Sequence, residues 1–311
     1  MAYAYFYENL VYQSIASNLG LKLEDFRFLP GIIPLPESGY ELFALLDGIP
    51  TAAPVFAAGP DDRRFSGIYG ALLQSQPDSF IVSVARANYE NEKYWLPQQD
   101  MEMSKTPLYT PSSASISAFI AGGGSLDYKL DSSAYPPPSG VLYPCYPDIV
   151  VDQPFRLFNQ IAQSSPFVFR MRFDRLVFLP VRPGGWFSQA VFTQAYASRG
   201  AGWQTGPGTV TWEELFGGDG ILKYVCNGVL AVSGIFLELQ SFGEYDSTSF
   251  ESLKENGGTS VWPYYLGESN LNQDYAMGED GSITITTTLP SPEILLFLIE
   301  AADISALTGR P

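Results

Sequence analysis

Six carboxylates surround the apolar stretch from residue 220 to residue 240, and they are the side chains best suited to catalysis. They are Glu213, Glu214, Asp219, Glu238, Glu244 and Asp246. Two carboxylates about 5 to 10 Å apart can act as acid and base, or as acid and nucleophile, in glycoside hydrolysis. Structural roles compete with this one, because Glu214 fits a helix-capping position and Asp219 lies in a glycine-rich turn. A carboxylate-only hydrolase therefore stays open as an alternative function.

Histidine is absent from the 311-residue chain. Its absence excludes histidine general bases, Ser-His and Cys-His relays, and imidazole metal ligands. The two cysteines, Cys145 and Cys226, cannot form a thiolate zinc site, although one disulfide between them is possible. A buried free thiol is the favoured interpretation for Cys226. The sequence therefore predicts no metal site and assigns no catalytic residue.

Glycine-rich loops do not provide a cofactor site. Gly122–Gly124 and Gly217–Gly220 both lack the Lys-Ser/Thr pair of a phosphate-binding loop and the strand-loop-helix context of a dinucleotide fingerprint. Calcium loops are equally unsupported, since Glu279-Asp280-Gly281 is too short for alternating oxygen ligands. The sequence predicts turns at these positions and no cofactor.

Three arginines stand out in so acidic a chain. Arg170 and Arg172 share the outward side of a predicted strand, so that these two form a short basic stripe on a sheet face, and Arg175 follows at the expected bulge. Guanidinium groups in such a stripe can clamp a carboxylate- or phosphate-bearing partner. The alternative is that they pair with acidic side chains of a neighbouring strand or subunit.

Tryptophans are the other candidates for partner contact. The chain contains Trp95, Trp186, Trp203, Trp212 and Trp262. Trp186 and Trp203 stand next to glycines in predicted loops, where exposed aromatic side chains can stack on sugars or anchor a protein interface. The competing interpretation is that these rings close the ends of a β core.

The formal net charge of −16 limits the possible partners. A field of this sign repels nucleic-acid phosphates and anionic membranes, so that no nucleic-acid partner is expected. The same acidic excess also keeps a folded protein soluble.

The chain is expected to be organised around Gly220–Gln240. Asn227-Gly228 lies between two apolar runs and predicts a tight hairpin turn, because both residues tolerate the positive φ of a type I′ turn. Cys226 and Val229 would then face each other across the turn.

Further strands are predicted from alternating apolar residues. They are Phe80–Ala85, a hairpin from Ile116 through Gly122–Gly124 to Leu130, Phe167–Val181 with a bulge near Asp174-Arg175, and Ile283–Leu289. Residues 110–124 are also rich in small and apolar residues, as in hairpins of β-barrel pores. An ordinary half-buried strand is the favoured interpretation of that segment.

Helices are predicted near both chain ends. Residues 2–19 show helical spacing, with Gly20 as C-cap. A capping box at Thr211 and Glu214 opens a short helical turn, and residues 250–256 form another short helix. Residues 292–307 are predicted as a buried helix, with a buried strand as the alternative. No confident prediction is made for residues 186–197.

These patterns indicate a mainly β fold, with an antiparallel sandwich or barrel-like core and helical segments near both termini. Residues 1–77 are expected to form a helix and an irregular proline-rich arm, and residues 78–311 a β-rich core domain with a C-terminal helical segment. Six prolines between residues 30 and 60 indicate the irregular course of the arm.

The favoured function is a non-enzymatic structural or assembly protein of a large particle, such as a phage or virus. Its partners would be other protein subunits, in a homo-oligomer or larger assembly. The main alternative is a β-rich glycan- or membrane-binding, toxin-like protein that inserts the 110–124 hairpin. The N-terminus lacks a secretory signal pattern and no apolar run is long enough to span a bilayer, so that export would use a signal-less route or lysis. With the assembly function, a virion or extracellular location is favoured.

Overall fold

The computed structural model describes residues 13, 16–22, 25–50, 64–97, 105–134, 165–255, 272–304 and 307. The strands are β1 (Phe26–Pro34), β2 (Tyr109–Thr110), β3 (Gly124–Asp131), β4 (Phe167–Pro180), β5 (Arg182–Pro183), β6 (Tyr224–Ser241), β7 (Asn272–Met277) and β8 (Ile283–Asp303). The α-helices are α2 (Gly39–Leu46), α3 (Phe65–Ser75), α4 (Phe80–Glu90), α5 (Ser113–Ile120), α7 (Gln189–Ser198), α8 (Trp212–Phe216) and α9 (Ser247–Glu255), and the 3₁₀ turns are η2 (Glu92–Tyr94) and η3 (Ser132–Ala134).

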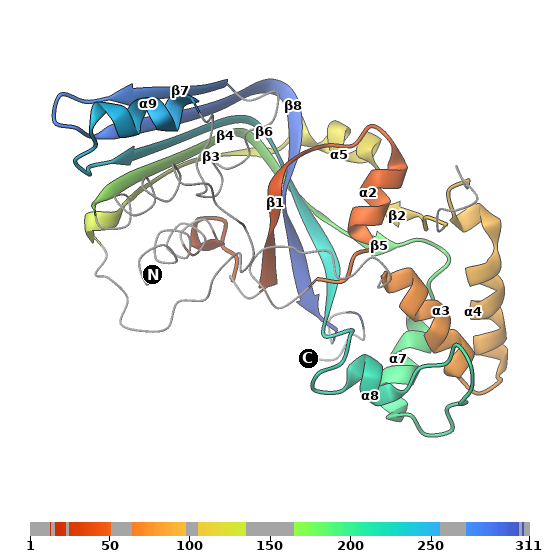
Figure 1. Ribbon diagram of the computed structural model, residues 1–311. Helices are drawn as coiled ribbons and strands as arrows, with labels where there is room; N and C mark the ends of the chain where they lie inside the picture. Colours follow the sequence, from red (N-terminus) through yellow and green to blue (C-terminus); the bar gives the residue numbers. More distant parts are fainter. Residues whose placement is uncertain are drawn as a thin grey trace.

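One antiparallel sheet dominates the fold (Figure 1). Six strands form it in the order β1-β8-β6-β4-β3, with β7 also paired to β8, while β2 and β5 form a separate two-stranded sheet. Among the described residues, strand accounts for 37% and helix for 34%. The prediction of a mainly β, antiparallel fold is confirmed.

The predicted hairpin turn at Asn227-Gly228 is wrong, because β6 runs straight through it. Asn227 is the extra residue of a bulge between the pairs Cys226–Ala301 and Gly228–Glu300. Its carbonyl oxygen accepts from Val181 N at 2.7 Å. Gly228 has no positive φ. It is needed for space instead, since a Cβ there would lie 2.2 Å from the Phe178 ring.

The predicted helix over residues 292–307 is also wrong for residues 292–303. These residues form the buried strand that was the alternative. Strand β8 continues from Ile283 to Asp303 and pairs with β6 along both halves. Between Leu289 and Ile294 it is interrupted by an irregularity that contains four exposed residues. Its second half is buried among apolar neighbours on both sheet faces, which explains why it is apolar without strict alternation.

Three strand irregularities coincide where the sheet bends. Strand β4 carries an extra residue at Asp174-Arg175 in its pairing with β3, which confirms the predicted bulge. Strand β6 is irregular at Gly234, where φ is +63° and a Cβ would lie 2.3 Å from an Asp174 carboxylate oxygen. The interruption of β8 after Leu289 lies opposite Gly234 in the pairing of β6 with β8. Bulges increase bending and twist, so that together they turn the sheet.

The hydrophobic interior consists of two clusters on opposite faces of the sheet, and the first of them continues across the bend. In β6, Leu230 and Val232 share the first cluster with Ile235 and Leu237, because the bulge at Gly234 shifts the side-chain alternation by one residue. The opposite face packs against helices before the bulge, at Val229, and becomes polar after it, at Glu238. One half of the sheet is therefore covered on both faces, and the other half presents a polar outer face.

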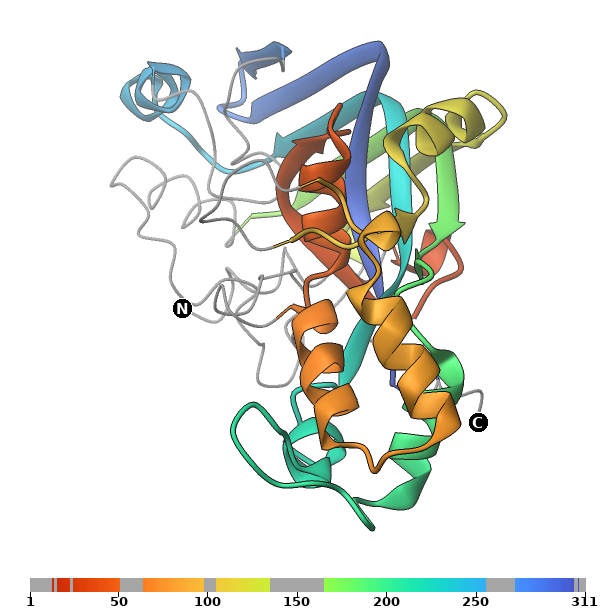
Figure 2. The same cartoon turned by 90° about the vertical axis from the view of Figure 1, so that its right-hand side faces the viewer.

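Helices α3, α4, α7 and α8 gather at one end of the molecule and are called the helical lobe here (Figure 2). The strand predicted for Phe80–Ala85 is wrong, since α4 begins there with the Ser79 side chain accepting from Val82 N. The first strand of the hairpin at residues 116–130 is wrong as well, because α5 begins after the Ser112 cap. Its second strand, β3, is confirmed, as are the capping box at Thr211 and a short helix near residue 250.

The N-terminal part is more regular than predicted. Residues 26–34 form a strand of the main sheet, and residues 39–46 and 65–75 form helices, so that the expected irregular course is wrong for these residues. Gly20 has a φ of +71° after helical residues, as expected for a C-cap. Most of the predicted helix at residues 2–19 lies outside the described residues. The division at residue 77 remains a prediction, and α3 and α4 contact each other across it.

Candidate functional site: the bend groove and the α4 stripe

A groove lies on the sheet surface where the three irregularities meet. Its volume is about 560 Å³, and it is called the bend groove here. It is lined by Ser125, Leu126, Asp127, Arg172, Phe173, Asp174, Arg175 and Ser291. Two of the three arginines singled out in the sequence therefore line one depression, and the third lies beside it in β4.

Arg170 is engaged with a neighbouring strand. Its Nε and Nη2 donate to the two carboxylate oxygens of Asp127 at 3.1 and 2.8 Å, in the bidentate geometry that matches guanidinium to carboxylate. This contact lowers the pKa of Asp127. For Arg170, pairing within the sheet is what the structure contains.

Arg172 and Arg175 make looser contacts. Arg172 Nε lies 3.7 Å from an Asp174 carboxylate oxygen, and its guanidinium carbon lies 5.3 Å from the Phe236 ring centroid. Arg175 Nη1 donates to the Asp174 carbonyl oxygen at 3.3 Å. With two arginines and two aspartates, the lining has no formal excess of charge and suits a polar segment of mixed charge better than a polyanion. Partner binding by these arginines stays a prediction.

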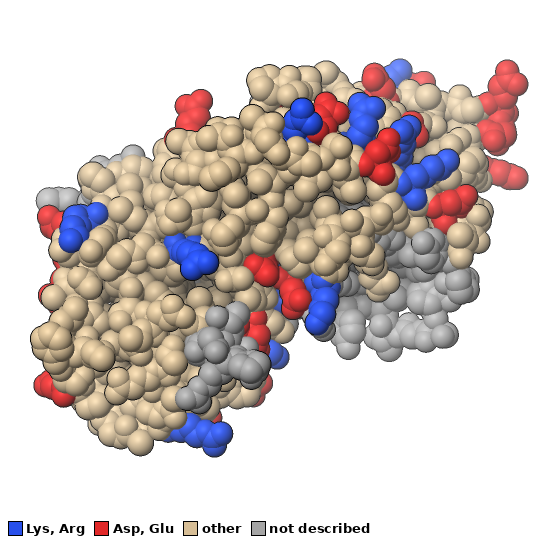
Figure 3. Space-filling model, turned by 180° about the vertical axis from the view of Figure 1, so that it is seen from behind, with Lys and Arg blue, Asp and Glu red and all other residues tan. Residues whose placement is uncertain are grey.

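Charged side chains of both signs surround this groove. Seen from behind, basic and acidic side chains alternate over the part of the molecule that holds β3 and β4, while much of the helical lobe is free of charge (Figure 3). Across this outer face Lys129 is opposite Arg170, which in turn is opposite Glu238. On this side of the molecule, the charged residues are therefore unevenly distributed.

The four tryptophans that the structure describes do not form exposed anchors. Trp186 is fully buried, so that the prediction of an exposed loop ring is wrong for it, and its Nε1 donates to Leu108 O at 2.8 Å. Trp203 is half-buried and donates to Ser198 Oγ at 2.9 Å. Trp95 and Trp212 also donate their indole N–H groups within the chain. Closure of the core is the interpretation that fits these four rings, and Trp262 lies outside the described residues.

An apolar surface that the sequence did not indicate lies on helix α4. Phe80, Ile81 and Val84 are 84%, 48% and 45% exposed, and these three residues are called the α4 stripe here. They occupy neighbouring positions on one side of the helix, while Val82 and Ala85 on the other side are buried. Sequence reasoning missed the stripe because Phe80, Val82 and Val84 alternate as in a strand.

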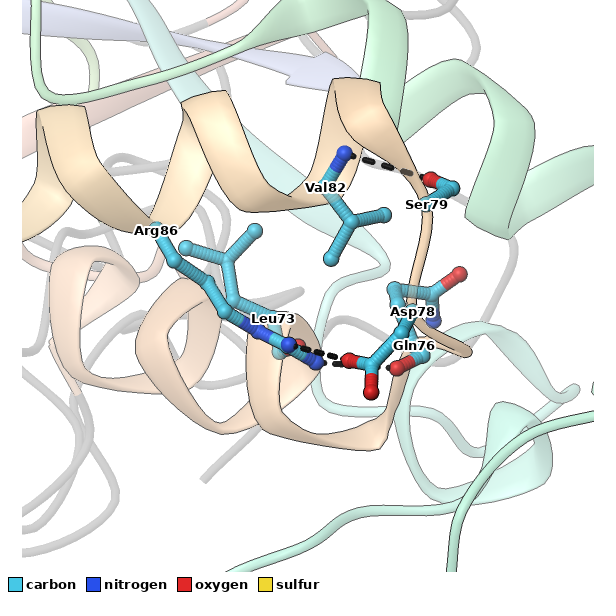
Figure 4. A network of polar contacts seen from close by, with 6 residues as sticks. All are labelled: Leu73, Gln76, Asp78, Ser79, Val82 and Arg86. Carbon is cyan, nitrogen blue, oxygen red and sulfur yellow. Dashed lines mark hydrogen bonds and ion pairs between the residues drawn. The ribbon is translucent and has the colours of Figure 1, made fainter.

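A network of polar contacts fixes the turn that presents the α4 stripe (Figure 4). Arg86 Nε and Nη2 donate to Leu73 O at 3.1 and 2.9 Å, and Nη2 also donates to Gln76 O at 3.0 Å. Arg86 Nη1 pairs with an Asp78 carboxylate oxygen at 2.6 Å. The guanidinium thus satisfies carbonyl groups at the C-terminus of α3, where a cation is also favoured by the helix dipole.

Replacing Arg86 by methionine, which keeps an aliphatic stem, is expected to lower the free energy of unfolding by about 2 kcal/mol, because two carbonyl oxygens lose their donors. Asp78→Asn is the matched control and removes only the exposed ion pair, with an expected cost below about 1 kcal/mol. Urea denaturation of both variants measures the difference. Equal effects would mean that the ion pair, and not the carbonyl contacts, fixes the turn.

The carboxylates considered for hydrolysis are divided between distant places. Glu214 completes the capping box of α8, and Asp246 accepts from Ser249 N at the start of α9. Helices α8 and α9 lie at opposite ends of the molecule in both ribbon views (Figures 1 and 2). Glu238 lies on the outer sheet face. Acids from the two ends therefore cannot act as one catalytic pair.

Two titratable side chains, those of Cys226 and Asp47, are buried inside the fold. Cys226 is a buried free thiol, as favoured from the sequence, and burial raises its pKa. Asp47 is fully buried and accepts from Ser66 N, Ser66 Oγ and Tyr109 Oη at 2.8, 2.6 and 2.7 Å. Burial raises the pKa of Asp47 to about 6. These contacts join α2, α3 and β2 inside the second cluster.

Within the described part of the chain, no group of three or more Cys, Asp or Glu residues is arranged to hold a metal ion. The same residues include no helix with the length and apolar character needed to cross a membrane. No family model, no curated protein and no solved structure matches this chain. A proposal about function must therefore be based on the surfaces described above.

Proposed function

We propose that this protein is a non-enzymatic structural subunit that assembles with further copies of itself, and that the α4 stripe is one of its contact surfaces. The observation that carries the proposal is the exposure of Phe80, at 84%, with Ile81 and Val84 beside it on the same helix. Grouped exposed apolar side chains on a folded chain are typical of protein contact sites. Aromatic side chains contribute most to such contacts.

The distribution of charge supports a second copy as the partner at this surface. Helices α3 and α7 contain no charged residue, and the charged residues of α4, Arg86 and Glu90, lie in its second half. Copies with a net charge of −16 repel one another, so that their contact is least unfavourable where charge is sparse. The Arg86 network also fixes the stripe before binding, which reduces the entropy lost on association.

We further propose a large particle, such as that of a phage or virus, as the setting, with a virion or extracellular location. The support comes from composition: no histidine, 24 prolines and many aromatic residues fit an interlocking structural protein better than an enzyme. The separation of the carboxylates argues in the same direction. The toxin-like alternative loses its support where residues 113–120, expected to insert as a hairpin, form helix α5.

Mass in solution, measured by light scattering over a concentration series, tests the proposal. The wild-type chain is expected to form species larger than a monomer, and Phe80→Ser is expected to reduce their population at least about tenfold, since a buried aromatic anchor contributes more than about 1.4 kcal/mol to a contact. Phe119→Ser is the matched control, because Phe119 is 58% exposed on α5 away from the stripe. A monomeric wild-type chain at every concentration, or an unchanged Phe80→Ser variant, contradicts the proposal.

A further inference from the structure

Two arginines of the bend groove lack a hydrogen-bonded carboxylate. Among the described residues, Arg175 makes one hydrogen bond, from Nη1 to the Asp174 carbonyl oxygen at 3.3 Å, and no ion pair. Arg172 Nε lies 3.7 Å from an Asp174 carboxylate oxygen, which is too far for a hydrogen bond. Both arginines are exposed. Their guanidinium groups are therefore available to a carboxylate from outside the chain.

The charges around the groove favour a single carboxylate as ligand. Arg170 beside the groove already holds Asp127 in a bidentate pair, with Nε and Nη2 at 3.1 and 2.8 Å from the two carboxylate oxygens. Once this pair is set aside, Arg172 and Arg175 face Asp174 alone among the described charged residues of the lining, which leaves an excess of one positive charge. One carboxylate balances this charge, whereas a polyanion would exceed it.

The groove has the size and the polar groups for a short protein segment. Its volume of about 560 Å³ lies within the range of about 300 to 1,000 Å³ that is usual for binding pockets. The hydroxyl groups of Ser125 and Ser291 line it beside the arginines, and Leu126 and Phe173 contribute apolar surface. Hydroxyl groups donate to carboxylates, so that the serines can add to a guanidinium contact.

An acidic turn between β7 and β8 has matching properties. Residues 278–280 are exposed at the tip of this hairpin, and a glycine on each side of the two acids keeps the turn narrow. The Asp280 carboxylate is used inside the turn, since its Oδ1 accepts from Ser282 N and Oγ at 3.0 and 2.7 Å. Glu279, which is exposed beside it, is the acid of the turn that a partner can bind.

A chain cannot place this turn in its own groove. Strand β8 runs from the turn to the groove, with Ile283 next to the turn and Ser291 in the lining. From Ile283 to Leu289 the strand pairs regularly with β6, and six steps of about 3.3 Å give a span of about 20 Å. A Glu279 carboxylate that enters the groove must therefore come from a second molecule.

We propose that the bend groove binds the Glu279 carboxylate on the β7–β8 turn of a second copy, with Arg172 and Arg175 as the residues that clamp it. The partner is a second copy because the chain itself carries the acidic turn that complements the groove in charge. Groove and turn are different surfaces, so that each copy uses its turn on one neighbour and its groove on another. Such heterologous contacts build rings or filaments, as a large particle requires.

This contact deepens the proposed function and rests on it. The β7–β8 hairpin and the helical lobe lie at opposite ends of the molecule, so that their contacts do not compete for space (Figure 1). The α4 stripe would bury apolar surface, whereas the groove would join unlike charges. Copies with a net charge of −16 are held apart in a charged region unless unlike charges face each other.

Zero-length cross-linking tests the contact directly. Arg175→Lys keeps the positive charge and provides an amine that a carbodiimide can couple to the Glu279 carboxylate when the two groups touch. Mass spectrometry is expected to find the 175–279 link in chain dimers, and the span of β8 means that such a link joins two molecules. Adding Glu279→Gln to Arg175→Lys is the matched control and should abolish the link. Absence of the link, or a link from position 175 to another acid of a second chain, overturns the proposal.

Charge exchange tests the same contact without a chemical reagent. Arg175→Glu and Glu279→Arg should each reduce the population of the largest species in solution at least about tenfold, because each variant leaves one charge of the pair unpaired. An equal mixture should regain the wild-type mass, since the unchanged turn of the first variant meets the unchanged groove of the second. No reduction, or a reduction that mixing does not reverse, overturns the proposal.

Glu213→Arg is the matched control for charge exchange. Glu213 is exposed and precedes another acid, as Glu279 does, but it lies in helix α8. Its replacement makes the same change in net charge and should leave the mass in solution unchanged.

The outcomes also separate this contact from the α4 stripe. A 175–279 link in chains whose mass Phe80→Ser leaves unchanged supports the groove contact and contradicts assembly through the α4 stripe. Larger species that Phe80→Ser reduces, without the 175–279 link, support the α4 stripe and overturn the groove contact.

Discussion

Replacing Trp186 by alanine is expected to lower the free energy of unfolding by about 3 to 5 kcal/mol, which is the usual cost of removing a large buried aromatic side chain. Trp186 is fully buried, and its ring lies 5.6 to 6.0 Å from those of Phe65, Tyr69, Tyr109 and Trp95. Residues from α3, from β2 and from the segment after η2 meet at this ring. Its removal leaves a cavity that they cannot all approach to fill.

The Trp186→Phe variant separates the contribution of the buried aromatic ring from that of the indole hydrogen bond. The acceptor, Leu108 O, also accepts a hydrogen bond from Gly184 N at 2.8 Å, so that it keeps a donor when the indole is lost. We therefore expect Trp186→Phe to cost less than half as much as the alanine variant. Trp203→Ala, at a half-buried position, is the matched control. Urea denaturation measures all three, and a cost below about 1 kcal/mol for Trp186→Ala would contradict a central packing role.

The strands with strict alternation could be predicted from the sequence. In β4, buried Phe167, Phe169, Met171 and Phe173 share one parity, and the break at Arg175 correctly indicated the bulge. The capping box of Thr211 and Glu214 was recognised because both contacts are local. These patterns depend on residues that are close in the sequence, and no distant part of the chain overrides them.

Distant contacts overrode the local pattern elsewhere. Asn227-Gly228 has the composition of a tight turn, yet Gly228 is needed because the Phe178 ring packs against it. Ile81, Val82 and Val84 favour strand by their branched side chains, but Val82 is buried in the cluster that α3 also lines. Ser79 and Ser112, each followed by helical residues that they cap, were the available signals for α4 and α5.

The candidate site could be predicted only in part, because some of its features depend on contacts between distant parts of the chain. Arg170 and Arg172 could be assigned to one sheet face from the parity of a single strand. The bend groove could not be predicted, because β3, β4 and the interruption of β8 all contribute to it. The α4 stripe was hidden by the wrong secondary structure, since apolar residues in a strand are expected to be half-buried.

Asp47 is expected to make the stability of the fold fall as the pH rises from about 4 to about 7. Burial raises its pKa to about 6, although hydrogen bonds from Ser66 and Tyr109 act in the opposite direction. In the unfolded chain an aspartate titrates near a pKa of about 3.9. The folded protein therefore holds the proton more tightly, so that the stabilisation is complete below about pH 4 and is lost as the pH rises through 6.

Asp47→Asn removes this titration while keeping a similar shape. Relative to this variant, the free energy of unfolding of the wild-type chain is expected to drop by about 2 kcal/mol between pH 4 and pH 7.5, because the pKa is about 6 in the folded chain and about 3.9 in the unfolded chain. Asp127→Asn is the control: because Arg170 lowers the pKa of exposed Asp127, this carboxylate stays ionised in the folded chain across the range, and the variant should give a curve nearly parallel to that of the wild type. Urea denaturation across this range measures both, and parallel curves for the wild type and Asp47→Asn contradict the prediction.

Asp47→Ala distinguishes the charge from the hydrogen bonds. It removes the acceptor for Ser66 N, Ser66 Oγ and Tyr109 Oη, so that buried donors remain without partners at every pH. We expect it to be less stable than Asp47→Asn by about 2 to 4 kcal/mol, with no pH dependence of the difference. Burying the carboxylate of Asp47 costs free energy when the group is ionised. The hydrogen-bond donors that it satisfies where α2, α3 and β2 meet explain why the carboxylate is present.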